Sequence, residues 1–214
     1  MTPSDVITEV RRIIQDSRTP YRYTDAELLG YVNQTLKRMA TLRPDLFADI
    51  VDITPEADTA IQKLPDEAIR LMDIFQVKGG TAVTEADREA MSRADPDWMT
   101  ATSGTPVNFM RHVKNGKRYF LYPPPSSGTV LIGEYAVSPE VLTINDEIEV
   151  IPEAYYATLI DGTVFLAESI DDEHVNSNRA KLFLDSFMQQ MGTAIQSREV
   201  TDTKAAGMQP EQVL

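Results

Sequence analysis

The side chains that could carry acid–base or metal chemistry are few in this chain of 214 residues. It has two histidines and no cysteine, which excludes disulfides, thiol nucleophiles and cysteine-ligated metal clusters. His112 alternates with Arg111 and Val113 in an expected strand, and a solvent-facing position is the simplest interpretation of it. The first histidine therefore gives no reason to expect catalysis.

The second histidine and one aspartate are the other candidates. His174 follows the acidic run 171–173, but on a helix only Asp171 would share its face, and two ligands do not complete a metal site. The attraction of acids to the positive end of a helix dipole explains the run better. Asp161 lies in an otherwise apolar segment, where a hydrogen bond to a neighbouring helix or subunit is the expected role.

The motifs of phosphate-binding loops, dinucleotide folds, zinc proteases and nucleophile elbows do not occur in the sequence. We therefore predict no catalytic residue, no metal and no cofactor. No stretch approaches the roughly 18 consecutive apolar residues of a membrane span, and residues 1–12 carry acids where a signal peptide has an apolar run. We expect a protein made in the cytoplasm, without contact with a membrane.

The charge of the chain is negative and unevenly distributed. The net charge is -13, and residues 136–214, with 14 acidic and 4 basic side chains, contribute -10 of it. A surface that binds duplex DNA needs clustered lysine and arginine, so tight DNA binding is not expected. The acidity has two open explanations, which are solubility alone and a functional electrostatic field.

Two amphipathic helices are predicted near the N-terminus, over residues 4–17 and 23–46. The second begins with a capping box between Thr24 and Glu27, and Pro44 ends it by disfavouring helical geometry at Arg43. The short connection between the two helices predicts antiparallel neighbours. The face of the second helix opposite its apolar stripe carries Asn33, Lys37, Arg38 and Thr41.

A β-rich region is predicted after the second helix. Short runs of β-branched residues separated by turn residues predict strands at 50–54, 59–64, 70–77 and 129–137. A weaker capping box between Thr84 and Asp87 predicts a helix over residues 85–94. Asn115-Gly116 predicts a type I′ turn that joins strands at 109–113 and 118–122.

Helices return in the C-terminal third. Residues 153–170 are apolar on nearly every side, which predicts a helix at the centre of its bundle or covered by a partner subunit. A last helix is expected at 172–191, with Gly192 kinking or ending it, and residues 199–214 should form a flexible, extended tail.

The predicted fold class is therefore α+β. We expect a four-helix bundle built from residues 1–49 and 150–198, an inserted β-rich domain at 50–149 and the extended tail. The only tryptophan, Trp98, follows Asp95-Pro96-Asp97, and it is either an anchor that a loop presents to a partner or part of a local core.

Several segments indicate a protein family more strongly when they are taken in their order along the chain than any one of them does alone. In order along the chain they read YTDAELLGYVNQTL, RPDL, LPDEAIRLMDI, VTEADREAMSRADPDW, RYFLYPPPSSGTVLIGEY and IPEAYYATLIDGTVF. This series, from about Tyr23 to Met191, resembles the head-to-tail adaptor proteins of tailed phages, the short-tailed ones in particular.

The resemblance implies a structural protein of the virion, made in the host cytoplasm, with no reaction and no cofactor. It implies a homo-oligomeric ring, a dodecamer, that docks beneath the portal protein and receives the tail or nozzle protein on its β domain. DNA would pass through the channel of the ring without specific binding, and the acidic C-terminal third could line that channel.

Three contact surfaces are expected on such a ring protein. They are the portal contact through the C-terminal tail, with Met208, Val213 and Leu214; a subunit contact through Asn33, Lys37, Arg38 and Thr41; and a tail-side contact through Asn115, Gly116 and Trp98. Two other functions remain open. One is a tail-completion or assembly-chaperone protein that is not retained in the particle, and the other is a hydrolase of unknown type.

Overall fold

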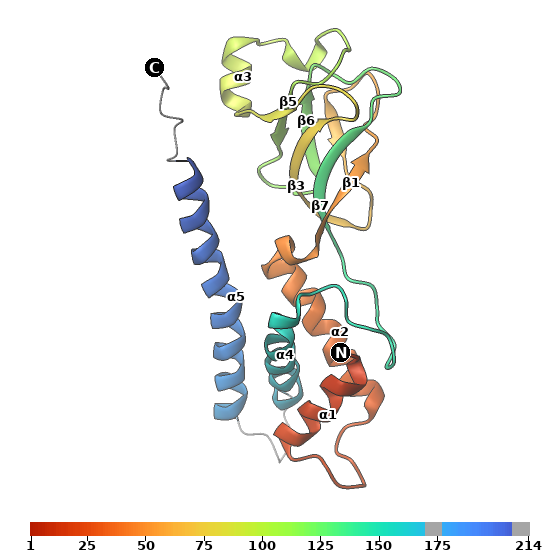
Figure 1. The fold of residues 1–214 in the computed structure, drawn as a ribbon, viewed down its shortest axis with the longest axis vertical. Coiled ribbons are helices and arrows are strands. Elements are labelled where there is room, and N and C mark those ends of the chain that lie inside the picture. The colour runs from red at the N-terminus through yellow and green to blue at the C-terminus, as the bar shows by residue number, and fades with distance from the viewer. Residues whose placement is uncertain (170–176, 207–214) are drawn as a thin grey trace, which may run out of the picture. The chain divides into compact units, whose positions relative to one another are not determined.

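The computed structural model describes residues 1–169 and 177–206, with side chains for residues 1–169 and 178–192. The chain divides into two compact units (Figure 1). A helical unit combines Met1–Leu42 with Glu140–Leu214, and a β unit comprises Arg43–Pro139. The β unit is thus inserted in the sequence between the two halves of the helical unit.

The N-terminal half of the helical unit holds α1 (Pro3–Ile14) and α2 (Asp25–Leu42). Both helices begin with a capping box, in which a threonine hydroxyl and a carboxylate three residues later each accept a backbone N–H. In α2 this is the predicted pair, because Thr24 N donates to Glu27 Oε2 at 2.8 Å and Glu27 N donates to Thr24 Oγ1 at 3.3 Å. The backbone hydrogen bond from Thr24 also holds the pKa of Glu27 below its ordinary value of 4.5.

The end of α2 agrees with the stop that Pro44 predicts, although the predicted range of 23–46 runs past that stop. The helix stops at Leu42, and the residues from Pro44 to Phe47 form a separate 3-10 turn. Arg43 between them has φ -132° and ψ 71°, outside the helical region, as expected for a residue that precedes proline. The predicted stop at Arg43 is therefore confirmed, and residues 44–46 of the predicted range do not belong to the helix.

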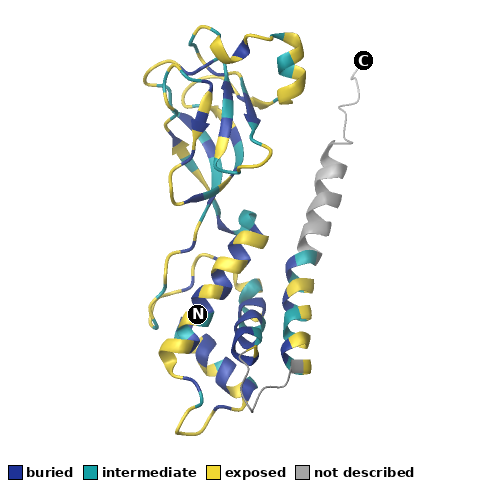
Figure 2. Cartoon of the chain, turned by 180° about the vertical axis from the view of Figure 1, so that it is seen from behind, coloured by how far each residue is buried: buried dark blue, intermediate teal, exposed yellow. Residues whose placement is uncertain are grey.

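The C-terminal half of the helical unit holds α4 (Tyr156–Glu168) and α5 (Ser177–Ala206). Helix α4 lies in the middle and packs against α1, α2 and α5, and most of its residues are buried (Figure 2). The sequence prediction of a central helix is confirmed. Tyr23 Oη donates to the carbonyl of Ala167 at 2.6 Å, which links the N-terminal half to the end of α4.

A glycine allows this central position. A Cβ atom at Gly162 would lie 2.5 Å from Thr35 Cγ2 on α2 and 2.9 Å from Phe187 Cδ2 on α5. Both neighbours are buried, so neither has free space to move into. Helix α4 can therefore touch helices on two sides at one level only because residue 162 has no side chain.

The predicted four-helix bundle is wrong. The described residues form five α-helices and two sheets, and one helix, α3 (Arg88–Ala94), belongs to the β unit. In the helical unit α5 packs mainly on α4, so the four helices do not close around a shared core. Helix α5 also runs to Ala206, so residues 199–206 are helical rather than an extended tail. Residues 207–214 of the expected tail lie outside the described residues.

The β unit contains two sheets. The first has the strand order β1-β7-β3 and is antiparallel throughout; the second has the order β2-β6-β5-β4, in which only the β4–β5 pair is parallel. The strands are β1 (Ala48–Ile53), β2 (Ile61–Lys63), β3 (Ala68–Val77), β4 (Thr84–Glu85), β5 (Asn108–Arg111), β6 (Arg118–Tyr122) and β7 (Leu131–Val137). Side chains from both sheets, among them Leu71, Phe109 and Leu131, share one core.

Two local predictions in the β unit are wrong. Thr84 does not cap a helix, because it lies in β4 and pairs with Asn108; the N-cap of α3 is Asp87, whose carboxylate accepts Ala90 N at 2.7 Å. Asn115-Gly116 does not form a type I′ turn, since neither residue has a positive φ. The hairpin itself is correct, and its strands pair from Asn108–Tyr122 to Arg111–Tyr119.

Replacing Gly162 by alanine should destabilise the helical unit. We expect Gly162→Ala to lower the free energy of unfolding by about 1–3 kcal/mol, because the added methyl overpacks a closed contact. Gly30→Ala is the matched control: Gly30 is also helical, nothing lies within 4 Å of its added Cβ, and it is exposed. The control should gain about 0.5–1 kcal/mol. Urea unfolding followed by circular dichroism measures both, and equal effects of the two substitutions would contradict the packing at Gly162.

Candidate functional site

His112 and Asp161, two of the ionisable candidates from the sequence, form hydrogen bonds within the fold. His112 lies just outside β5, and its Nδ1 accepts the backbone N–H groups of Lys114 at 3.2 Å and Asn115 at 3.0 Å. Asp161 accepts hydrogen bonds from Ser186 at 2.7 Å and Gln190 at 2.9 Å, both on α5, which confirms the predicted bond between helices. His174 and the acidic run 171–173 lie outside the described residues.

Tyr119 differs from these groups because its phenol is buried without a hydrogen bond to the described residues. Tyr119 is completely buried in the core of the β unit, and its hydroxyl has no hydrogen-bond partner among the described residues. Burial raises the pKa of Tyr119, so the phenol stays neutral. No group of three or more histidine, aspartate and glutamate side chains in the described part of the chain could hold a metal ion. Neither observation gives an active site.

A buried ion pair fixes the connection between α1 and α2. Arg11 donates to Asp16 at 2.6 Å, to the carbonyl of Tyr23 at 2.8 Å and to Asp25 at 2.7 Å. Asp16 in turn accepts the backbone N–H groups of Arg22 at 2.7 Å and Tyr23 at 3.2 Å. Arg11 and Asp16 are both more than nine-tenths buried, so this pair holds the loop in one conformation.

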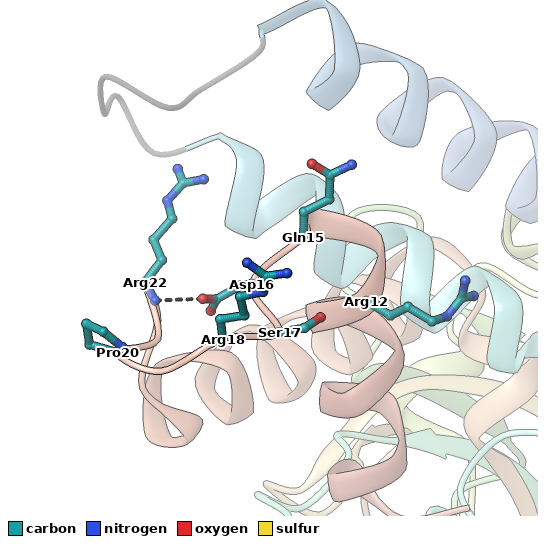
Figure 3. Close-up of a pocket in the computed structure, with 7 residues that line it drawn as sticks. All are labelled: Arg12, Gln15, Asp16, Ser17, Arg18, Pro20 and Arg22. Atoms are coloured by element: carbon teal, nitrogen blue, oxygen red, sulfur yellow. Dashed lines mark hydrogen bonds between the residues drawn. The ribbon is translucent and has the colours of Figure 1, made fainter.

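A hollow lies over this connection (Figure 3). Its lining is Arg12, Gln15, Asp16, Ser17, Arg18, Pro20 and Arg22. The cations do not converge on a common point: Arg12 points to the far side from Arg22 in Figure 3 and pairs with Glu9 at 2.8 Å. Asp16 is already bonded to Arg11. The hollow is the surface of a structural loop, and its side chains are not arranged to bind a small ligand.

The expected subunit contact on α2 is partly internal. Asn33 is buried, and its amide pairs with the backbone of Leu142, donating to the carbonyl at 3.0 Å and accepting the N–H at 2.8 Å. Lys37, Arg38 and Thr41 are exposed on the outer face of α2, with the Arg38 guanidinium 5.6 Å from the centre of the Phe165 ring. Three of the four predicted residues are thus available to a partner, and Asn33 holds another segment of its own chain.

Trp98 closes a local core, which was the alternative to a partner contact. It is 3% exposed, packs with Ala60 and Met110, and meets Phe120 edge to face at 5.6 Å. Its Nε1 donates to Ser92 Oγ at 3.0 Å. The other two residues expected on the tail side, Asn115 and Gly116, are not beside it in the core but lie in the β5–β6 loop (residues 112–117).

The β5–β6 loop is held rigidly by the neighbouring backbone. The carbonyl of Gly116 accepts Leu71 N at 2.9 Å, and the carbonyl of Lys117 accepts Leu64 N at 2.8 Å. Asn115 is exposed, and its side chain accepts Lys117 N at 3.0 Å. These bonds explain why the local turn preference of Asn-Gly did not decide the conformation. The portal-contact residues Met208, Val213 and Leu214 lie outside the described residues.

An acidic segment was missed in the sequence analysis. We call residues 140–153 the acidic strap, because they contain Glu140, Asp146, Glu147, Glu149 and Glu153 and no lysine or arginine. All five carboxylates are on exposed residues. The signal in the sequence was a run of five acidic residues with no basic residue between them. The prediction considered only the summed charge of the whole C-terminal third.

The comparison with known protein families identifies the chain. The sequence model of the SU10 adaptor protein family matches residues 1–210. The chain belongs to this family of phage head-to-tail adaptors. No curated protein matches the sequence.

Membership in the SU10 adaptor family confirms the resemblance seen in the sequence and gives the chain its role. It is a structural adaptor protein of a phage. None of the described helices has both the length and the apolar character needed to cross a membrane. The functional surfaces of such an adaptor are protein contacts, so its charge and exposure matter more than any cleft.

The buried Arg11–Asp16 ion pair should contribute more to the stability of this adaptor than an ion pair at its surface. We expect Asp16→Asn to lower the free energy of unfolding by about 3 kcal/mol, because Arg11 would stay buried without its closest carboxylate. Glu9→Gln is the control, since the Arg12–Glu9 pair is largely exposed and is expected to contribute less than about 1 kcal/mol. Urea unfolding measures both. A loss at Asp16 no larger than the loss at Glu9 would show that the pair does not fix the loop.

Proposed function

We propose that this protein forms a closed ring that joins the portal to the tail or nozzle protein at the phage head-to-tail junction and continues the DNA channel. The observation that carries the proposal is the family match over residues 1–210. Closed rings arise when one surface of a subunit binds a different surface of the next and the rotation closes. The ring is proposed to be a dodecamer, as the resemblance of the sequence implies.

The charge of the chain supports passage of DNA without retention. Phosphates bind to clustered lysine and arginine, and here residues 136–214 carry 14 acidic against 4 basic side chains. We assign this part of the chain to the lumen, where like charge would keep DNA from adhering. A lumen found neutral or basic in the assembled ring would contradict this assignment.

The C-terminal segment is the proposed portal contact. Helix α5 has 30 residues and so extends about 45 Å from its first residue. Residues 207–214, with Met208, Val213 and Leu214, follow it directly. A short apolar segment at the end of a long helix can reach a partner at a distance from the rest of its unit. The exposed residues Lys37, Arg38 and Thr41 on α2 remain the proposed contact to a neighbouring subunit.

The proposed function is tested by counting copies in purified virions. Quantitative mass spectrometry should find the chain in the particle at a copy number comparable to that of the portal protein. Absence of the chain from virions that nevertheless require its gene for assembly would instead identify a tail-completion or assembly-chaperone protein.

Removing the apolar side chains of the C-terminal segment should weaken portal binding and leave the fold intact. We expect the triple substitution M208S, V213S and L214S to weaken binding to purified portal at least about tenfold, since apolar anchors dominate such contacts. The double substitution Q209S and Q212S in the same segment is the control and should bind like the unchanged chain. Sedimentation with portal rings measures both. Equal binding by the two variants would remove this segment from the portal contact.

A further inference from the structure

The β5–β6 loop, together with the strand residues on either side of it, carries the densest positive charge of the chain. Residues 111–118 include Arg111, Lys114, Lys117 and Arg118 and no acid, in a protein whose net charge is -13. Arg111 is paired with Glu85 at 2.8 Å, and Lys117 Nζ donates to the carbonyl of Asp66 at 2.8 Å. Lys114 and Arg118 are exposed and form no ion pair within the described residues.

An apolar side chain stands beside these charges. Val113 is 90% exposed, the largest exposure among the large apolar side chains of the described residues. The loop is not free to fold Val113 inward, because its carbonyls at Gly116 and Lys117 are bonded to backbone outside the hairpin and His112 accepts two of its N–H groups. A rigid loop that presents one apolar side chain among cations is preorganised for a protein surface of opposite charge.

The acidic strap offers that surface. In the sequence its exposed acidic residues flank Val141, which is 69% exposed, and Val150, which is 36% exposed. None of the five carboxylates forms an ion pair within the described residues. The strap therefore combines exposed valines with negative charge, whereas the loop combines an exposed valine with positive charge.

The strap is also held rigidly by its own unit. Its anchors are the buried side chains of Ile148 and Ile151, the pairing of Asn33 with Leu142, and two backbone bonds to the N-terminus. In those bonds Ser4 N donates to the carbonyl of Ile144 at 3.1 Å, and Ile148 N donates to the carbonyl of Met1 at 3.0 Å. Two preorganised surfaces lose little conformational entropy when they meet.

We propose that the β5–β6 loop of one copy of this chain docks on the acidic strap of a second copy. In this contact Val113 packs against Val141, and Lys114 and Arg118 face Glu147 and Glu149. The two surfaces are different parts of the chain, so each copy offers one to each neighbour, as a closed ring requires. The inference rests on the proposed ring and adds the loop and the strap to the α2 residues as surfaces by which its copies meet. It also takes the loop away from the tail-side contact that the sequence suggested for Asn115 and Gly116, and it takes the strap out of the segment that is proposed to line the channel.

Charge complementarity favours a second copy of this chain as the binding partner of the loop. The strap supplies the acids and the exposed valines that the loop needs. Each copy of the chain carries one loop and one strap, so a ring contains equal numbers of the two surfaces. Complementary charge at an interface sets register and association rate more than affinity. The contact therefore forms transiently in a free pair of chains, where a disulfide can trap it, and it becomes stable when the ring closes.

The absence of cysteine from the chain provides a direct test. Full-length V113C and full-length V141C are mixed at low ionic strength under mild oxidation, and mixed disulfides are counted by mass spectrometry. A disulfide needs the two Cα atoms within about 7 Å, so only a true contact forms it in high yield. Any bond between the two variants is necessarily between copies. V107C replaces V113C in the control, because Val107 is also an exposed valine of the β unit.

Charge reversal makes the test specific. We expect K114E and R118E in the V113C chain to lower the disulfide yield about tenfold, and E147K and E149K in the V141C chain to restore it. A V113C yield no higher than that of V107C, or no restoration by the second reversal, overturns the proposal. If the K114E R118E variant fails to assemble particles but the disulfide test gives neither expected result, the loop binds the tail protein or DNA instead of a second copy. The outcome does not depend on portal binding, so it separates failure of this contact from failure of the proposed function.

Discussion

The close approach of α2 and α5 to α4 at Gly162 is the constraint on which the helical unit depends. Segments from both ends of the sequence must meet around α4, and the missing side chain at residue 162 gives them the space. The polar bonds of the unit then follow from this approach. Tyr23 can reach the carbonyl of Ala167, and Asp161 can bond to Ser186 and Gln190, only while α4 stays between its neighbours.

Polar side chains that bind backbone groups fix the segments between the helices. Arg11 and Asp16 hold the α1–α2 connection, and Asn33 holds the acidic strap through Leu142. Each is buried, so breaking its bonds would leave a polar group without water. This arrangement gives an adaptor what it needs for assembly, namely surface segments whose charges are fixed in position before a partner arrives.

The sequence predicted those features whose cause is local. The capping box at Thr24, the stop before Pro44 and the apolar character of α4 are decided by neighbouring residues, and all are present in the structure. Family membership was also recognisable, because it depends on the order of segments rather than on their packing.

The features that failed depend on distant contacts. The β5–β6 loop is shaped by bonds from Gly116 and Lys117 to residues outside the hairpin, which no Asn-Gly rule contains. The sequence left the role of Trp98 open, because Ala60 and Met110, which pack with it, lie outside its own segment. Gly192 costs a helix only about 1 kcal/mol and did not end α5. The bundle prediction assumed that every helix shares one core, whereas α5 packs mainly on α4.

A cryo-electron microscopy map of the head-to-tail junction tests the central claim most directly. The account predicts copies of this chain in a closed ring between portal and tail, with an acidic channel surface. Density at that position that belongs to another protein, with this chain absent from the junction, would contradict it.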